Sequence, residues 1–230
     1  MSRGAQTQLA KSRDLPNPNI YVQALLGEYS AWALDEERAP RLKGNWRSEF
    51  GGLDKTPLDL EIGTGNGHHF AWRAQSNPER FLIGIELKYK PLIQSIRRAR
   101  SNGSENVRML RYNARLLTEL FQDEELNDIV IHHPDPWLKK SQRKHRLIQT
   151  DFLSEMHRVQ RPRGVVEFKT DSEDYYNWAL PLFRQSPYQL IGETRDLHQS
   201  DFAADNFVTQ FEQLFLSKGQ PIFYAKLLKG

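Results

Sequence analysis

The clearest structural signal in the chain is Leu58-Asp59-Leu60-Glu61-Ile62-Gly63-Thr64-Gly65-Asn66-Gly67. Its first five residues predict a short buried strand, and the glycines after them end that strand and open a helix over residues 68–76. Glycines at such a junction let the backbone approach a ligand at the carboxyl end of the strand. The stretch therefore predicts a strand–loop–helix unit with a ligand site in its loop.

The same alternation continues toward the C-terminus. Strands are predicted over residues 81–86, 107–110, 128–131 and 165–169, with helices over 89–101, 114–121 and 147–159 between them. This order indicates an α/β, doubly wound, mostly parallel sheet with right-handed connections. The last third differs, because helices near 173–184 and 207–217 accompany strands near 188–193 and 221–227. A late hairpin would give the parallel sheet an antiparallel C-terminal edge.

The N-terminal part has its own character. Residues 1–18 are polar and end in Leu15-Pro16-Asn17-Pro18, so we expect a flexible N-terminal arm. Residues 19–230 are expected to form a single domain, on which the aromatic-rich segment 20–50 packs as a cap.

The composition excludes several classes of protein. The 230 residues are 38% hydrophobic and 27% charged, which is typical of a globular chain. The sequence holds no apolar run of about 18 residues, so no membrane span is expected, and its N-terminus lacks the apolar segment of a secretory signal. Cysteine is absent, which excludes disulfides and thiolate metal sites. The histidines lack the spacing of a zinc site, so no metal is expected, and we predict a cytoplasmic protein.

The net charge of +3 is unevenly distributed. Residues 88–163 carry 16 Lys+Arg against 9 Asp+Glu, which leaves 16 against 20 in the remainder. A basic middle in an otherwise acidic chain favours a surface that binds a polyanion, and solvated helix faces are the alternative.

The glycine loop and two acidic residues predict the cofactor. Glu86 ends the second strand, where it can hold the two ribose hydroxyls of a nucleoside. His68 occupies the position where a dinucleotide site needs a small residue, and the loop lacks the lysine of a P-loop. Glu61 and Glu86 would repel a pyrophosphate but suit the cationic sulfonium and ammonium groups of S-adenosyl-L-methionine. We therefore expect that cofactor, held around Gly63 and Gly65.

A second motif, His133-Pro134-Asp135-Pro136-Trp137-Leu138-Lys139-Lys140, follows the fourth strand. The prolines fix the backbone around Asp135, and the loop shares the carboxyl edge of the sheet with the glycine loop. Trp137 offers a surface for a base, and the basic run Lys139–Arg146 follows directly. An isolated loop of this kind could be a rigid turn over a core tryptophan, but the basic run favours an enzyme that modifies nucleic acid.

With these motifs the chain resembles the bacterial tRNA (guanine-N7)-methyltransferases of the TrmB type. The resemblance covers residues 58–227 and includes Gly84-Ile85-Glu86, Lys169-Thr170-Asp171 and Thr209-Gln210-Phe211-Glu212. It implies a class I, Rossmann-like methyltransferase fold and transfer of a methyl group from S-adenosyl-L-methionine to N7 of a guanine in the tRNA variable loop. It also implies cofactor contacts from Glu61, Glu86, Asn113 and Asp135, with Asp135 as the catalytic residue, and substrate contacts from Lys139, Asp171, Thr209, Gln210, Phe211 and Glu212. Asn113 departs from the family, which usually has aspartate there.

The implied chemistry suits these residues. Guanine N7 carries a lone pair and no proton, so transfer requires alignment and charge stabilisation rather than a strong base. Asp171 and Glu212 can accept the N1–H and N2–H donors that distinguish guanine, and Lys139 can donate to O6 or to a phosphate. A class I methyltransferase acting on another nucleobase or on a protein, and a tRNA-binding protein without catalysis, remain as alternatives. The oligomeric state stays open.

Overall fold

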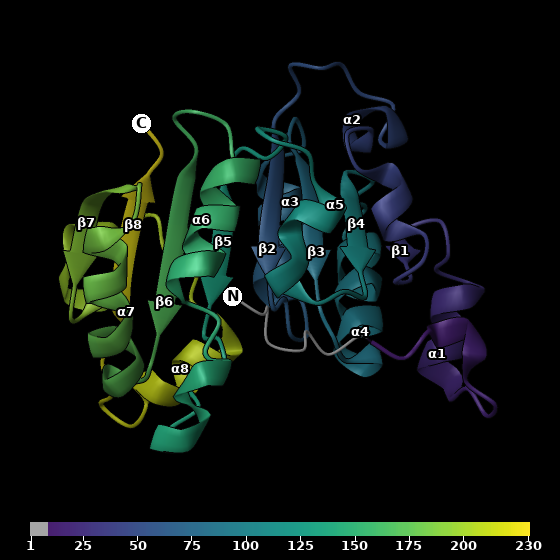
Figure 1. The fold of residues 1–230 in the computed structure, drawn as a ribbon. Helices are drawn as coiled ribbons and strands as arrows, with labels where there is room; N and C mark the ends of the chain where they lie inside the picture. The colour runs from purple at the N-terminus through teal and green to yellow at the C-terminus, as the bar shows by residue number, and fades with distance from the viewer. Residues whose placement is uncertain (1–8) are drawn as a thin grey trace.

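A computed structural model describes residues 9–230 of the chain, which form an eight-stranded sheet in the order β1-β4-β3-β2-β5-β6-β8-β7 (Figure 1). The neighbouring strands from β1 to β6 pair in parallel, and β8 is antiparallel to both β6 and β7. The predicted doubly wound, mostly parallel sheet with an antiparallel C-terminal edge is confirmed. The strands are β1 Ala33–Leu34, β2 Leu58–Ile62, β3 Phe81–Ile85, β4 Val107–Leu110, β5 Ile129–His132, β6 Val165–Thr170, β7 Gln189–Thr194 and β8 Phe223–Leu228.

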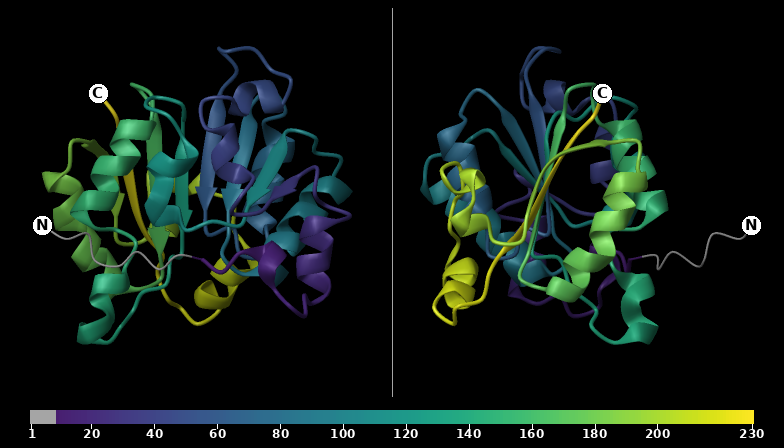
Figure 2. Two further views of the ribbon diagram at one scale, coloured as in Figure 1. Left: turned by 45° about the vertical axis from the view of Figure 1, so that its right-hand side comes forward. Right: turned by 90° about the vertical axis from the view of Figure 1, so that its left-hand side faces the viewer.

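Helices cover both faces of the sheet. One apolar cluster joins α1, α3 and α4 to the sheet, and a larger one joins α5, α6 and α7 to the opposite face. Figure 2 shows this arrangement edge-on in its right-hand view, with α8 on the side of α3. The helices are α1 Ile20–Leu26, α2 Trp46–Glu49, α3 His68–Ser76, α4 Tyr89–Ser101, α5 Leu117–Leu120, α6 Thr150–Val159, α7 Glu173–Gln185 and α8 Gln210–Leu216. Within residues 9–230, none of them is both long and apolar enough to cross a membrane.

Residues 58–67 fold as their sequence predicts. All five residues of β2 are buried, and α3 begins directly after Gly67. Gly67 has a φ of +75°, and a Cβ built on it would lie 2.4 Å from Cα of Ser95 in α4. The third glycine is therefore required both by the turn and by the close packing of α3 on α4.

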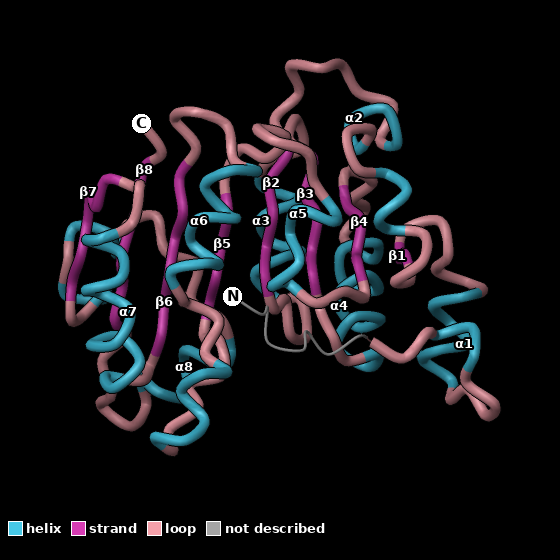
Figure 3. The backbone as a smooth tube through the Cα atoms, viewed as in Figure 1, coloured by secondary structure: helices cyan, strands magenta, loops and turns pink. Residues whose placement is uncertain are grey.

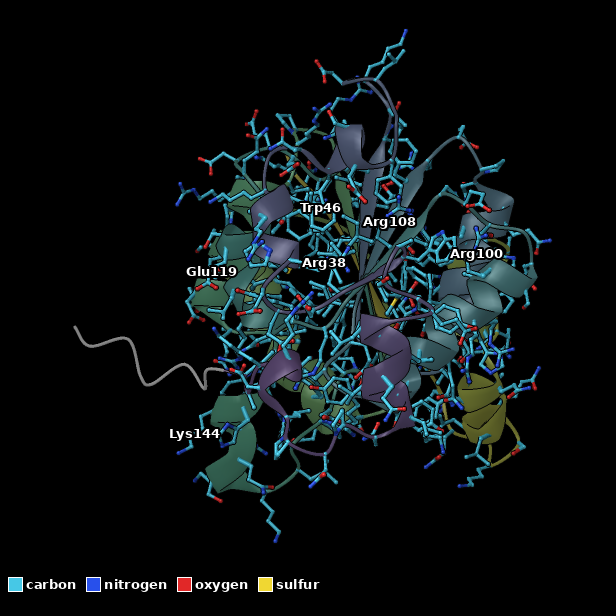
Figure 4. The ribbon with its side chains drawn as sticks, turned by 90° about the vertical axis from the view of Figure 1, so that its right-hand side faces the viewer. Arg38, Trp46, Arg100, Arg108, Glu119 and Lys144 are labelled. Carbon is cyan, nitrogen blue, oxygen red and sulfur yellow. The ribbon has the colours of Figure 1, made fainter. Side chains whose placement is uncertain are left out.

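The segment before β2 packs on the domain, as expected for a cap, and also adds the short strand β1 to the edge of the sheet. Its aromatic residues lie under arginines, since the guanidinium of Arg100 is 4.2 Å from the ring centre of Trp32, and that of Arg108 is 4.6 Å from Phe50. Figure 4 labels both arginines, together with Trp46, the fully buried first residue of α2.

Part of the predicted flexible arm contacts the domain. Ser12 is buried and its hydroxyl donates to a Glu36 carboxylate oxygen at 2.9 Å, while Arg13 Nε is 3.0 Å from Asp35 Oδ2. These contacts attach residues 12–13 to the domain. Burying the polar hydroxyl of Ser12 would cost free energy without a hydrogen-bond partner, and Glu36 provides that partner. Residues 1–8, the rest of the expected arm, lie outside the described residues.

The strand order creates a crevice at the carboxyl ends of the central strands. From β2 the chain moves outward through β3 and β4, then returns to the other side of β2 with β5 and β6. Connections that leave in opposite directions open a gap between β2 and β5, and open α/β sheets bind ligands at such points. The loops of this edge lie at the lower end of the strands in Figures 1 and 3.

Candidate functional site

A cavity of about 420 Å³ opens at this edge, between the loops that follow β2, β3, β4 and β5. Both predicted motifs contribute to it, which the sheet topology requires because their strands are neighbours. The sequence-predicted residues among those that line it are Gly63, Gly65, Glu86, Asn113, Asp135 and Trp137.

The glycine loop forms a cradle for a ligand. Gly63 and Gly65 have φ values of +75° and +54°, which residues other than glycine rarely adopt. A Cβ at either position would meet no atom of the described chain within 4 Å, so it would project into open space beside the cavity. The backbone of this loop is therefore available to a ligand without an intervening side chain.

Glu86 joins the glycine loop to the loop after β3. Its carboxylate accepts the backbone N–H of Gly65 at 3.2 Å and that of Lys88 at 2.9 Å. Since it also lines the cavity, Glu86 has the acceptor oxygens and the position that a pair of ribose hydroxyls requires.

Glu61 does not line this cavity, although it was expected to contact the cofactor. Its side chain is 4% exposed, and Oε2 lies 2.7 Å from Nδ1 of His69 in the first turn of α3. Alternating residues of a strand face opposite sides of a sheet, and this parity directs Glu61 under α3. A direct role of Glu61 toward the cofactor stays a prediction.

Asn113 begins the short turn after β4, where its side-chain oxygen accepts the N–H of Arg115 at 3.1 Å. Its amide lines the cavity and provides polar atoms without a charge. The neighbouring Tyr112 donates its hydroxyl to Glu119, and burial together with that carboxylate raises the pKa of Tyr112.

The loop after β5 holds Asp135 at the mouth of the cavity. Asp135 is exposed, and the residues His133 and Trp137 on either side of it have φ values of +49° and +44°. Two non-glycine residues in the left-handed region within five positions indicate a backbone held in an uncommon shape, a feature that gathers at functional sites. Trp137 lines the cavity and packs against His145 at 5.2 Å between ring centres.

His133 connects the cavity to the expected substrate residues, and sequence reasoning missed it. Its Nδ1 lies 3.2 Å from Oδ1 of Asp171, and its ring lies 5.2 Å from that of Phe211. Burial would raise the pKa of Asp171, but the hydrogen bond from His133 is among the contacts that leave this pKa below its ordinary value. Asp171 is therefore an ionised acceptor close to the cavity.

The residues of α8 and its N-cap divide into a group at the surface and a buried residue, Glu212, in a hydrogen-bond network. Thr209 caps it by accepting the N–H of Glu212 at 3.1 Å, and Gln210 and the half-exposed Phe211 lie at the surface. Glu212 is fully buried and accepts from His198 Nε2 and Asn206 Nδ2, each at 2.8 Å. The predicted contact of Glu212 with guanine would thus require this network to open. The helical spacing of Phe211 and Leu214 by itself favours core positions, but both side chains are half exposed.

The basic run divides into two groups. Lys139, Lys140 and Lys144 are exposed, and Lys144 lies at the surface on the short helix Lys140–His145 (Figure 4). Arg146 is fully buried, pairs with Asp174 and donates to the backbone oxygen of Pro136 at 2.8 Å. The expectation that the whole run is free to contact phosphates was wrong for Arg146, because its guanidinium holds the Asp135 loop against α7.

Comparisons with known proteins agree with this geometry. Residues 55–225 match a family model described as "Putative methyltransferase". The chain is 47% identical over 207 residues to the tRNA (guanine-N(7)-)-methyltransferase of Bdellovibrio bacteriovorus, covering 90% of this chain and 99% of that protein. It is 36% identical over 181 residues to the enzyme of the same name from Brevibacillus brevis, covering 79% and 84%.

Solved structures resemble the fold at lower identity. A SAM-dependent methyltransferase from Aquifex aeolicus matches with a TM-score of 0.53 and 13% identity, covering 80% of this chain and 87% of that one. The 16S rRNA methyltransferase KamB matches with a TM-score of 0.56 and 16% identity, covering 80% and 94%. These similarities show that the sheet described above is the class I methyltransferase fold.

Proposed function

The chain belongs to the tRNA (guanine-N(7)-)-methyltransferase family, and on this premise we propose that it transfers a methyl group from S-adenosyl-L-methionine to N7 of a guanine in the variable loop of tRNA. The single observation that carries the proposal is the cavity that Asp135, Glu86 and the open glycine loop share. The bacterial relatives and the tRNA substrate favour a cytoplasmic enzyme.

The residues of the cavity fit the cofactor. The open space beside Gly63 and Gly65 can receive its amino-acid part, the Glu86 carboxylate can accept the ribose hydroxyls, and Asn113 can meet the adenine. S-adenosyl-L-methionine supplies an electrophilic methyl group on a positively charged sulfur. The predicted contact of Glu61 with the cofactor would require its carboxylate to leave His69, which it now contacts at 2.7 Å.

Asp135 provides electrostatic stabilisation. It lies at the mouth of the cavity on a loop held by two prolines, by the left-handed residues beside it and by Arg146. Positive charge moves onto the purine as N7 is methylated, and a fixed carboxylate that faces the ring favours this change. N7 has no proton to lose, so Asp135 needs no role as a base.

The substrate side lies next to Asp135, toward α8. Asp171 is an ionised acceptor suited to the N1–H and N2–H donors of guanine, and Phe211 offers an exposed ring beside it. The exposed Lys139, Lys140 and Lys144 extend from the same loop and can contact phosphates.

The experiment that tests the function incubates the protein with labelled S-adenosyl-L-methionine and an unmodified tRNA transcript, and then separates the nucleosides. We expect the label in 7-methylguanosine. Label in another nucleoside or in protein would favour a different methyltransferase, and tRNA binding without label would favour a binding protein that lacks catalysis.

A further inference from the structure

A second cavity, of about 470 Å³, lies on the α3 side of the sheet. Its walls are α3, the strands β5, β6 and β8, and the segment 197–207 that precedes α8. None of the residues assigned above to the cofactor or to the target guanine lines it, and among the described residues it shares only His132 with the first cavity.

The sheet is built to keep this face polar. Val166 and Phe168 of β6 face the apolar core on the other side, whereas Glu167 and Lys169 of the same strand line the cavity. The neighbouring strand β8 adds Tyr224 and Lys226 to the cavity wall. The face of a strand that packs against a helix carries apolar residues. The charged residues at these positions suit a polar ligand instead.

The cavity has more cationic than anionic side chains. Arg73, Lys169 and Lys226 line it, against Glu167 and Asp205. The ammonium of Lys226 is 3.7 Å from Glu167, too far for a hydrogen bond, and it is partly exposed. One terminal nitrogen of Arg73, Nη2, donates to Asp59 Oδ2 at 2.8 Å, whereas its buried Nε has no hydrogen-bond partner within the part of the chain that the structure describes. Lys226 Nζ and Arg73 Nε can therefore still donate to an anionic oxygen.

Aromatic rings lie beside these cations. Trp72 of α3 stacks on Phe207 with ring centres 4.8 Å apart and an angle of 17°, and both rings line the cavity. Trp72 is partly exposed, so a planar ligand can extend this stack. Aromatic and cationic groups in one cavity suit a nucleotide, which has both a flat base and a phosphate.

His132 lies between the two cavities, since among the described residues it is the one that lines both. Burial, with the nearby Lys169 adding to it, lowers the pKa of His132 well below its ordinary value, so the ring is neutral. Neither ring nitrogen has a hydrogen-bond partner within residues 9–230. A buried neutral imidazole needs one donor and one acceptor, and ligands in the two cavities can provide them.

We propose that the second cavity binds another nucleotide of the tRNA, close to the target guanine, with its phosphate at Lys226 and Arg73 and its base on Trp72. The inference rests on the proposed function, because the same RNA must occupy the methyl-transfer site. Binding there would also fix the segment that carries Asn206, which bonds to both Lys169 and Glu212.

The test compares Lys226→Gln with Lys55→Gln, a control at an exposed lysine in the loop before β2, at the opposite ends of the strands. We expect Lys226→Gln to reduce the slope of log affinity for tRNA against log salt by about one unit, and Lys55→Gln to leave it unchanged. Trp72→Leu should weaken tRNA binding about tenfold or more, while Trp72→Phe retains most of it. Cofactor affinity should be that of the wild type in all four variants, and thermal unfolding checks that each one folds.

A direct probe titrates the wild type with each of the four ribonucleoside 5′-monophosphates and follows tryptophan fluorescence. We expect quenching that disappears in Trp72→Phe and that tRNA reverses by competition. An unchanged salt slope in Lys226→Gln would overturn the proposal, and so would a bound mononucleotide that tRNA does not displace, which would indicate a site for a free nucleotide. If the wild type forms no 7-methylguanosine the proposed function fails, whereas a normal product with unchanged tRNA binding by the variants contradicts the second cavity alone.

Discussion

Replacing the three exposed lysines of the Lys139–Arg146 run by glutamine should weaken tRNA binding without altering the fold. Lys139, Lys140 and Lys144 make no ion pair within the described residues, so their ammonium groups are free to contact phosphates. Each phosphate contact that is lost removes about 0.7–0.9 from the slope of log affinity against log salt. Three lost contacts should therefore flatten the slope by about two to three units.

The same run offers a matched contrast in Arg146→Met. Arg146 is fully buried, pairs with Asp174, and its guanidinium lies 5.0 Å from the ring centre of Tyr175. Removing it should cost about 2–3 kcal/mol of folding free energy, the range for charged hydrogen bonds with some added packing loss. Because Asp174 keeps Arg143 as a partner at 2.6 Å, the cost stays below that of a wholly unpaired charge.

The assay is fluorescence anisotropy of labelled tRNA from about 50 to 200 mM salt, with urea unfolding alongside. The lysine triple variant should lose slope and keep the wild-type midpoint, and Arg146→Met should lose stability and keep the slope at temperatures where it is folded. An unchanged slope in the triple variant would mean that these lysines do not contact phosphates and form a solvated face.

Three further outcomes are expected. Glu86→Ala should weaken binding of S-adenosyl-L-methionine by about 2–4 kcal/mol, measured by calorimetry, because two charged acceptor oxygens are lost; wild-type affinity would contradict the ribose assignment. Asp135→Asn should lower single-turnover methylation by about two to three orders of magnitude and change tRNA affinity less than about tenfold, since it removes one fixed charge near the reacting ring; normal turnover would leave the loop as a rigid support only. His132→Phe should change the pH dependence of stability: the folded-state pKa of His132 lies well below its ordinary value of 6.5, so the unfolded chain binds more protons below that pH and wild-type stability falls as pH drops. The variant should make this fall shallower by up to ~1.4 kcal/mol per pH unit in urea titrations, and identical wild-type and variant profiles would count against a neutral buried ring.

Local patterns were enough to predict the parallel sheet and the cofactor loop. The predicted strand over 58–62 and helix over 68–76 have these bounds in the structure, because their signals lie within a few adjacent residues. The glycine loop and the Asp135 loop could be placed together, since both follow parallel strands and must meet at one edge.

The features that sequence reasoning missed depend on contacts between distant residues. In the sequence, Arg146 resembles the exposed cations of the basic run. It is buried because it pairs with Asp174, which lies 28 residues later in the chain. His133 contacts Asp171, which is 38 residues away in the chain, and no periodic sequence pattern predicts that contact. Asp59 and Glu61 are two residues apart in β2, so strand parity puts both side chains on the same face of the sheet. Asp59 pairs with Arg73 of α3 at 2.8 Å, so this is the face under α3.

In the proposed reaction, N7 of a tRNA guanine accepts the methyl group. The most direct measurement compares two transcripts of one tRNA, one with guanosine and one with 7-deazaguanosine, which has carbon in place of N7, in methylation with labelled S-adenosyl-L-methionine. We expect label in the guanosine transcript, all of it in 7-methylguanosine, and none in the 7-deazaguanosine transcript despite comparable binding. Equal labelling of the two transcripts would place the methyl group on another atom and exclude N7 as the acceptor.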